Sequence, residues 1–177
     1  MAKILVTGAN GQLGYELQQL APLFTEHQFR FCSRAQLDVT DAAQVQKEIE
    51  TFAPEYCINC AAYTAVDKAE TEAEAAFAGN ATAPKNLALA SKQMGAHFIH
   101  ISTDYVFDGT ATAPQKEEAP TAPVNQYGLS KLQGEKEVMA ANEDAIIIRT
   151  SWVYSAHGAN FVKTMMRLMP AKPELRV

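Results

Sequence analysis

The sequence predicts an α/β protein built on a doubly wound parallel sheet with helices on both faces. Short apolar segments alternate along the chain with longer segments whose apolar residues recur at helical spacing, which is the order of βαβ units. The first apolar segment, residues 4–6, leads directly into glycines at positions 8, 11 and 14. A strand, a glycine-rich turn and a helix in this order place a helix N-terminus where it can bind the phosphates of a dinucleotide.

The first half of the chain holds expected strands at residues 4–6, 28–32 and 56–61. Leucines at helical spacing predict a helix over residues 15–20. The next helix is expected over residues 41–52, because Thr40 or Asp41 can cap its first turn and Pro54 ends it.

The second half continues the alternation. Residues 72–94 are rich in alanine and predict a helix that Pro84 kinks or divides and Gly95 ends. Residues 108–125 carry prolines among polar residues and indicate an irregular surface loop. The remaining expected elements are strands at 97–101 and 145–148 and helices at 126–141 and 161–169. The whole pattern, residues 1–177, is that of one Rossmann-type domain, whose ligands bind at the carboxyl ends of the strands.

Composition fits a globular protein with one core. The chain has 177 residues, 47% of them hydrophobic, and a net charge of −5. Lysines and arginines are scattered, so we expect no nucleic-acid partner. No apolar run is long enough to cross a membrane, and the chain opens with a core strand in place of a signal peptide. We therefore expect a cytoplasmic protein without a membrane partner.

The glycines have distinct expected roles. Gly8 permits the tight turn, Gly11 lets a phosphate approach the main chain, and Gly14 lets helix and strand pack closely. Their spacing is G-x-x-G-x-x-G and not the standard G-x-G-x-x-G, so a purely structural turn is the alternative.

The cysteine pair Cys57 and Cys60 matches a C-x-x-C pattern, but it lies in an expected strand. Residues three apart on a strand point to opposite faces, so the two thiols cannot easily share a metal or close a disulfide. We expect buried, unreactive cysteines and no metal site.

Tyr127 and Lys131 lie four residues apart on an expected helix and therefore share a face. A free tyrosine has a pKa of about 10, and a nearby ammonium lowers it. The pair is then a workable proton donor to a carbonyl oxygen, although Y-x-x-x-K alone is common on helix surfaces. Its combination with the glycine turn and with a hydroxyl at a strand end favours catalysis.

These motifs together resemble the extended short-chain dehydrogenase/reductase family. The resemblance rests on residues 7–14 (TGANGQLG), residues 102–107 (STDYVF) and Tyr127-x-x-x-Lys131. With residues 67–70 (DKAE) and 149–154 (RTSWVY), the pattern is similar to the narrower family of dTDP-4-dehydrorhamnose reductases along the whole chain.

The resemblance implies an oxidoreductase that uses NAD(P)H to reduce the 4-keto group of dTDP-4-dehydro-L-rhamnose, giving dTDP-L-rhamnose for cell-surface polysaccharide synthesis. Tyr127 would be the general acid, Lys131 would lower its pKa and hold the nicotinamide ribose, and Thr103 would orient the carbonyl. The implied substrate-binding residues are Thr103, Asp104 and Trp152. The implied cofactor-binding residues are Gly8, Asn10, Gly11, Gln12, Leu13, Gly14, Ser33, Arg34, Asp38, Val39, Ala62, Tyr63, Thr64, Tyr127 and Lys131.

Several of these residues have a simpler interpretation. Asp38 could be a turn residue and Trp152 a packing residue. Asp67 and Glu70 are better explained as a solvated helix start. The histidines, His27, His97, His100 and His157, have no partner at a suggestive spacing, and we interpret them as structural.

Cofactor choice depends on the end of the second strand. NAD-preferring sites usually place an acidic residue there, whereas this chain has Ser33 and Arg34 and no acid before Asp38. A guanidinium suits a 2′-phosphate, which favours NADPH, with NADH as the second choice. A requirement for Mg²⁺ is left open.

Members of the family are longer, and this chain ends inside an expected strand that begins at Glu174. We expect it to be the N-terminal portion of a reductase, with the C-terminal substrate subdomain largely absent, turnover poor or lost, and self-association through exposed apolar surface; a homodimer is one assembly the sequence allows. The alternatives are a nucleotide-sugar epimerase or dehydratase of the same superfamily, and a non-catalytic subunit like the regulatory subunit of methionine adenosyltransferase. Tyr105, where a dehydratase would carry an acid, favours the reductase.

Overall fold

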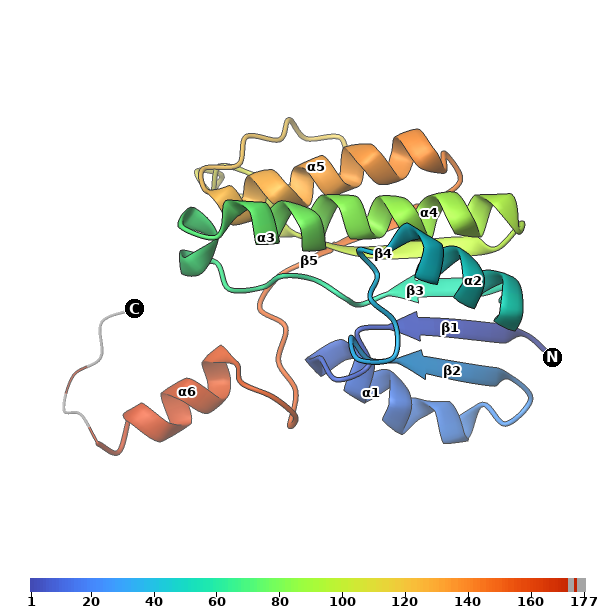
Figure 1. Cartoon of the computed structure of the whole chain (residues 1–177). Coiled ribbons are helices and arrows are strands. Elements are labelled where there is room, and N and C mark those ends of the chain that lie inside the picture. The colour runs from blue at the N-terminus through green and yellow to red at the C-terminus, as the bar shows by residue number, and fades with distance from the viewer. Residues whose placement is uncertain (172–173, 175–177) are drawn as a thin grey trace.

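The computed structural model places five parallel strands in one sheet, in the order β2-β1-β3-β4-β5 (Figure 1). The strands are β1 (Lys3–Thr7), β2 (Gln28–Cys32), β3 (Tyr56–Asn59), β4 (His97–Thr103) and β5 (Ile146–Thr150). The structure describes residues 1–171 and 174. The expected strand beginning at Glu174 lies, apart from that residue, outside the described part of the chain.

The α-helices are α1 (Gln12–Leu20), α2 (Ala42–Phe52), α3 (Ala73–Phe77), α4 (Ala83–Gln93), α5 (Gln126–Ala141) and α6 (Phe161–Leu168). The predicted order of elements and the parallel sheet with helices on both faces are confirmed. α2, α4 and α5 pack side by side over one face, α1 lies on the other, and α6 extends beyond the carboxyl ends of the strands (Figure 1).

The boundaries differ most around the alanine-rich segment. In place of one helix over residues 72–94, α3 and α4 are joined by a π-helical turn, Ala78–Thr82. Pro84 lies in the first turn of α4, as expected if it begins a second helix. β3 ends at Asn59 and not at residue 61, whereas β4 continues to Thr103.

The core lies between the sheet and the layer of α2, α4 and α5. Val45, Ile49 and Phe52 of α2 are buried against Leu5 and Cys57 of the central strands. The opposite face is more open toward the edge: Ile148 on β5 is 46% exposed, whereas its neighbour Ile147 packs against the core.

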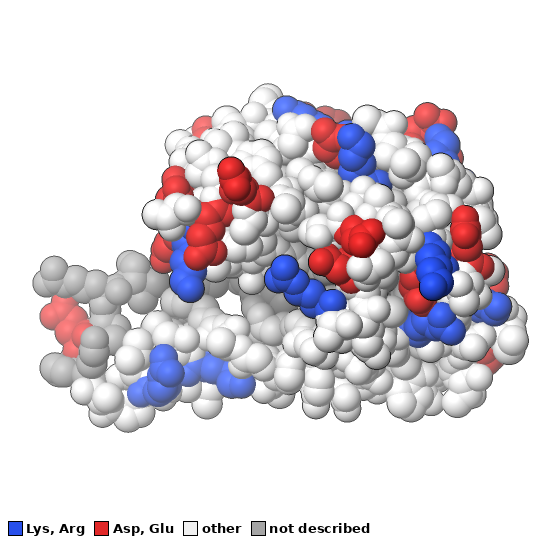
Figure 2. Space-filling view, viewed as in Figure 1, with Lys and Arg blue, Asp and Glu red and all other residues white. Residues whose placement is uncertain are grey.

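On the face drawn in Figure 2, lysines and arginines are interspersed with acidic residues and form no continuous basic surface. None of the helices in the described residues combines the length and the apolar character that crossing a bilayer requires.

Candidate active site

A cavity of about 760 Å³ opens at the carboxyl ends of β1, β2 and β3. The chain leaves β1 toward β2 on one side and returns to β3 on the other, so this is the point where the strand order reverses and where such sheets bind ligands. Nine of the expected cofactor-binding residues line it: Gly8, Asn10, Gly11, Arg34, Asp38, Val39, Ala62, Tyr63 and Thr64. The other six, Gln12, Leu13, Gly14, Ser33, Tyr127 and Lys131, do not line this cavity.

Two glycines shape the turn after β1. Gly8 has φ +68°, and a Cβ there would lie 2.5 Å from the main-chain nitrogen of Ala61. A Cβ on Gly14 would lie 2.3 Å from the carbonyl oxygen of Gly8. Both positions therefore require glycine, and the turn, α1 and the end of β3 can approach one another only because these side chains are absent.

The first turn of α1 lacks the side-chain cap that α2, α5 and α6 carry. Asp41, Asn125 and Asn160 accept hydrogen bonds from the first main-chain N–H groups of α2, α5 and α6. The position before α1 is Gly11, whose lack of a side chain provides no such acceptor. The N–H groups and positive dipole end of α1 thus suit an anion such as a pyrophosphate.

The segment after β2 carries a cation, Arg34, and an acid, Asp38, whose carboxylate is already hydrogen-bonded. The exposed Arg34 lines the cavity. Asp38 accepts hydrogen bonds from the main-chain nitrogen and the hydroxyl of Thr40, at 3.0 and 2.7 Å, and these bonds lower the pKa of its carboxyl group. Asp38 is therefore both a turn residue and a cavity residue. Ser33 Oγ donates to Gln36 Oε1 at 2.8 Å.

Thr103, Tyr127 and Lys131 are all buried, with 6%, 9% and 2% of their surface exposed. Thr103 ends β4, while Tyr127 and Lys131 come from consecutive turns of α5. Burial is the main cause that raises the pKa of Tyr127, and a hydrogen bond with Thr103 acts against it. The phenol therefore stays protonated at neutral pH, which is the state of a proton donor.

The expected effect of Lys131 on Tyr127 is not found. Lys131 Nζ donates to the carbonyl oxygen of Ile101 at 2.7 Å, and burial lowers its own pKa to about 8. The ammonium is thus directed at the strand, and the pKa of Tyr127 is raised where a decrease was expected. Sequence spacing placed the two residues on one face but could not give the direction of the lysine side chain.

Asn80 joins the two sides of the site, and the motifs of the sequence did not identify it. It is fully buried in the π-helical turn. Its side chain accepts from the main-chain nitrogen of Tyr63 and donates to Tyr63 O and to Ser130 Oγ, at 2.9, 3.0 and 2.9 Å. A Cβ on Gly134 would lie 1.9 Å from Asn80 O, so glycine lets α5 approach this turn. A buried, polar π-helical turn thus ties the cavity wall to the helix that carries Tyr127.

Besides the buried Thr103, the expected substrate residues Asp104 and Trp152 are both exposed. Asp104 follows Thr103 and accepts a hydrogen bond from its hydroxyl at 3.1 Å. Trp152 is 69% exposed, and its ring packs edge-on against Phe161. Its φ of +54° is unusual for a bulky residue. Such strain clusters at functional sites, and the exposure argues against core packing.

Residues 155–160 cross the N-terminal end of α1, which the sequence did not predict. The ring of His157 stacks on Tyr15 at 4.2 Å and contacts Asn10 O at 3.2 Å. Asn160 Nδ2 donates to Gln12 Oε1 at 2.9 Å. This segment, which leads from β5 to α6, is held against the glycine turn.

The remaining interpretations of single residues have mixed outcomes. Glu70 accepts from the main-chain nitrogen of Gln126 at 2.9 Å, so it supports the start of α5 and is more than a solvated residue. Burial raises the pKa of both Cys57 and Cys60 to about 12, as expected of unreactive thiols. Among the described residues, no three His, Cys, Asp or Glu side chains are grouped to hold a metal ion.

The chain is similar to reductases over nearly its whole length. A relative from Burkholderia thailandensis named dTDP-4-dehydrorhamnose reductase is 46% identical over 182 residues, which cover 99% of this chain and 58% of the relative. The Escherichia coli protein of the same name is 44% identical, with 98% and 59% covered. The chain thus spans about three fifths of the length of these relatives.

Solved structures of the same kind superpose closely. A dTDP-4-dehydrorhamnose reductase from Clostridium acetobutylicum has a TM-score of 0.92 at 46% identity, covering 98% of this chain and 61% of that one. One from Bacillus anthracis, in complex with NADP, has a TM-score of 0.93 at 43% identity, covering 98% and 62%. The family model described as RmlD substrate binding domain matches residues 2–177, and the chain therefore belongs to that family.

Proposed function

We propose that this chain is the cofactor-binding and catalytic portion of a reductase that converts dTDP-4-dehydro-L-rhamnose to dTDP-L-rhamnose, with residues 1–177 forming one nicotinamide-cofactor domain. The observation that carries the proposal is the convergence of Thr103, Tyr127 and Lys131 at the end of β4, joined through Asn80 to the wall of the 760 Å³ cavity. The names of the relatives support the same substrate.

The cavity fits a nicotinamide dinucleotide. Its cradle exists because Gly8 and Gly14 lack side chains, and the uncapped first turn of α1 suits the pyrophosphate. Val39 and Asp38 would flank the adenine, and Ala62, Tyr63 and Thr64 would line the cofactor. When bound, the reduced nicotinamide would supply the hydride for carbon 4 of the sugar.

Arg34 favours NADPH over NADH. Its guanidinium is exposed at the cavity, where it can pair with a 2′-phosphate, whereas Asp38, the nearby acid, is engaged by Thr40. The Bacillus anthracis relative was solved with NADP. Replacing Arg34 by alanine should weaken NADPH binding by about tenfold and leave NADH binding nearly unchanged, as measured by nicotinamide fluorescence. Equal losses for both cofactors would remove Arg34 as the determinant.

The side chains of this chain have separable roles in the reduction. Tyr127, kept protonated by burial, donates its proton to the 4-keto oxygen. The Thr103 hydroxyl hydrogen-bonds and orients the carbonyl. Lys131 would hold the nicotinamide ribose through its ammonium, one of whose donors is held by Ile101 O. Asp104 and Trp152 contact the sugar nucleotide at the outer rim of the site.

Two measurements on the 177-residue chain test the proposal. The first is titration with NADPH and NADH, followed by nicotinamide fluorescence, and we expect tighter binding of NADPH. The second is NADPH oxidation with dTDP-4-dehydro-L-rhamnose, with UDP-glucose as a control sugar nucleotide. Oxidation that depends on the keto sugar supports the reductase. Cofactor binding without such oxidation, in this chain and in one extended to the length of its relatives, would reject it.

A further inference from the structure

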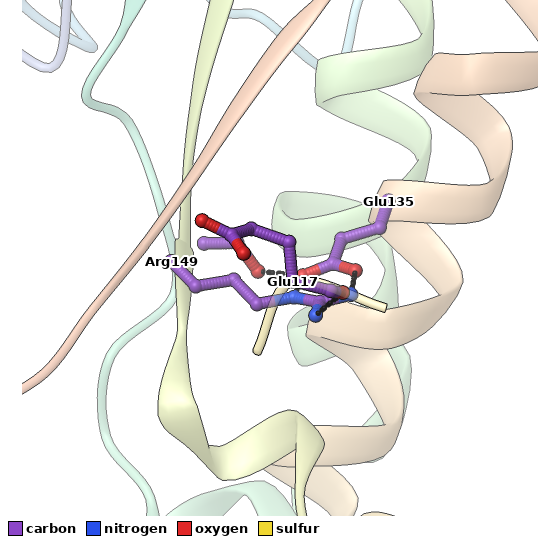
Figure 3. Close-up of polar contacts among 4 residues, drawn as sticks. Glu117, Glu135 and Arg149 are labelled. Carbon is purple, nitrogen blue, oxygen red and sulfur yellow. Dashed lines mark hydrogen bonds and ion pairs between the residues drawn. The ribbon is translucent and has the colours of Figure 1, made fainter. Parts of the chain in front are cut away.

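The roles described so far for the proposed reduction leave out a buried carboxylate on α5. Glu135 is 5% exposed and lies one turn after Lys131 on the same helix. Figure 3 shows Glu135 and Arg149 pointing toward each other from α5 and β5. Arg149 donates to both carboxylate oxygens of Glu135, from Nε at 3.0 Å and from Nη2 at 2.7 Å.

The same carboxylate also reaches β4. Ser102 Oγ donates to Glu135 Oε1 at 2.5 Å. Ser102 immediately precedes Thr103, the residue expected to orient the carbonyl. One side chain of α5 therefore contacts the strand end that carries Thr103 and, through Arg149, the strand end that precedes Trp152.

Arg149 extends the cluster outward. Its Nη1 donates to the carbonyl oxygen of Glu117 at 3.0 Å (Figure 3). Its guanidinium lies 5.2 Å from the centre of the Phe107 ring. Both residues belong to the long loop between β4 and α5. A bidentate arginine–carboxylate pair has a fixed planar geometry, so it sets the relative position of the elements it joins.

Glu135 is also a charged neighbour of the Lys131 ammonium. On α5, Glu135 follows Lys131 and the neutral Tyr127 precedes it. From β4, His100 faces Lys131, and burial lowers the pKa of this histidine to about 3, so it is uncharged near neutral pH. Burial lowers the pKa of Lys131 to about 8, and the negative charge of Glu135 acts in the opposite direction.

We propose that Glu135 is a positioning residue of this site: its carboxylate fixes the Lys131 turn of α5 against the ends of β4 and β5 and serves as the counter-charge of the Lys131 ammonium. This role rests on the proposed reduction, because it assigns Glu135 to the catalytic geometry. Its effect on the charge of Lys131, however, can be measured without turnover.

The first test is the titration of Lys131 in the cofactor-free protein. The ¹³Cε resonance of Lys131 in lysine-labelled protein, assigned by its loss in Lys131→Arg, is followed against pH. In Glu135→Gln we expect the midpoint to fall by about one pH unit, because a negative neighbour is lost. Glu137→Gln is the matched control: it removes a carboxylate from the same helix, but one paired with Lys85 at 2.8 Å, and should leave the midpoint unchanged.

The second test is kinetic. In Glu135→Gln, kcat should fall by roughly tenfold to a hundredfold and its alkaline limb should move to lower pH, while the dissociation constant of NADPH stays within about twofold. Glu135→Asp keeps the charge but shortens its reach, so it should restore the titration midpoint and only part of kcat. Loss of stability alone would not move the midpoint or the alkaline limb.

The outcomes separate this inference from the proposed reduction. If wild-type protein does not reduce the keto sugar, the reduction fails and the Lys131 midpoint still decides the role of Glu135 as counter-charge. An unchanged midpoint in Glu135→Gln, or an equal shift in Glu137→Gln, overturns the inference. If Glu135→Gln does not fold, the double variant Glu135→Gln/Arg149→Gln, which leaves no unpaired arginine, is compared with Arg149→Gln alone, so that only the Glu135 charge differs, and the lower midpoint is expected in the double variant.

Discussion

The two halves of the sheet differ in the groups that form the site at the carboxyl ends of their strands. β1, β2 and β3 surround a cavity whose lining includes two glycines of the turn after β1 and several alanines, and Leu5 and Val6 of β1 are fully buried. At the other half of the sheet, β4 supplies the Thr103 hydroxyl and the adjacent α5 supplies the phenol and ammonium groups. The outer strand β5 leaves Ile146 and Ile148 about half exposed, at 53% and 46%.

The two halves therefore rely on different interactions, one on backbone contacts and the other on side-chain hydrogen bonds. The cavity half depends mainly on backbone geometry: the glycine turn is local in sequence, and it packs closely against the main chain of Ala61 after β3. The reactive half depends on side-chain bonds between distant segments: Asn80 reaches Ser130, 50 residues away, and Ser102 reaches Glu135, 33 residues away. Apart from the charge of Arg34, the cavity half should therefore be sensitive mainly to changes in backbone shape, whereas the reactive half should be sensitive to single polar groups.

Loss of the Tyr127 hydroxyl should give the largest effect and divide the two halves most clearly. Tyr127→Phe removes the proposed proton donor but keeps the ring that packs near Tyr105. We expect kcat to fall roughly 10²- to 10⁴-fold, with the NADPH dissociation constant unchanged. Steady-state kinetics and cofactor titration measure the two quantities. Turnover that survives the substitution would remove Tyr127 from the chemistry.

A side chain at Gly14 should damage the cavity half through shape alone. In Gly14→Ala the new Cβ meets Gly8 O at 2.3 Å, whereas in Gly11→Ala it lies 3.3 Å from the same atom. We expect Gly14→Ala to lower the free energy of unfolding by about 1–3 kcal/mol and to weaken NADPH binding at least about tenfold. Gly11→Ala is the milder control. Equal effects of the two substitutions would mean that the close contact at Gly14 is not what matters.

The cavity half could be predicted from the sequence more completely than the reactive half. The glycine turn and the residues of β2 and α2 follow from local periodicity and capping, and nine of the expected cofactor residues do line one cavity. The π-helical turn at Asn80, the lysine directed at Ile101 O and the carboxylate shared by Ser102 and Arg149 were missed. Each depends on which side chain a distant segment presents, and spacing along one element carries no such information.

Because β5 is partly exposed at the edge of the sheet, replacing its neighbouring isoleucines should lower the free energy of unfolding by unequal amounts. Ile147 packs against the core and Ile148 is 46% exposed, although they are adjacent on β5 and chemically identical. Ile147→Ala should lower the free energy of unfolding by about 2 kcal/mol and Ile148→Ala by less than about 1 kcal/mol, measured by urea denaturation. A similar cost at both positions would show that the outer face of β5 is covered in solution, for example by self-association, which sedimentation would detect.

The smallest expected effect concerns Cys57, on the central strand β3. Complete burial raises the pKa of its thiol from 9.0 to about 12, so the folded protein keeps a proton that the unfolded chain loses above pH 9. The contribution of this group to stability is therefore complete below pH 9 and is lost as the pH rises toward 12. The loss of unfolding free energy in Cys57→Ala should be about 1 kcal/mol smaller at pH 10 than at pH 7, since only the wild-type protein carries this thiol.

Ile58→Ala is the control: it lies next along the strand, has no titrating group and should lower the free energy of unfolding equally at both pH values. If the cost of Cys57→Ala does not change with pH, the thiol is more accessible to solvent than its burial indicates. The cavity half, to which β3 belongs, would then be less tightly packed than we infer.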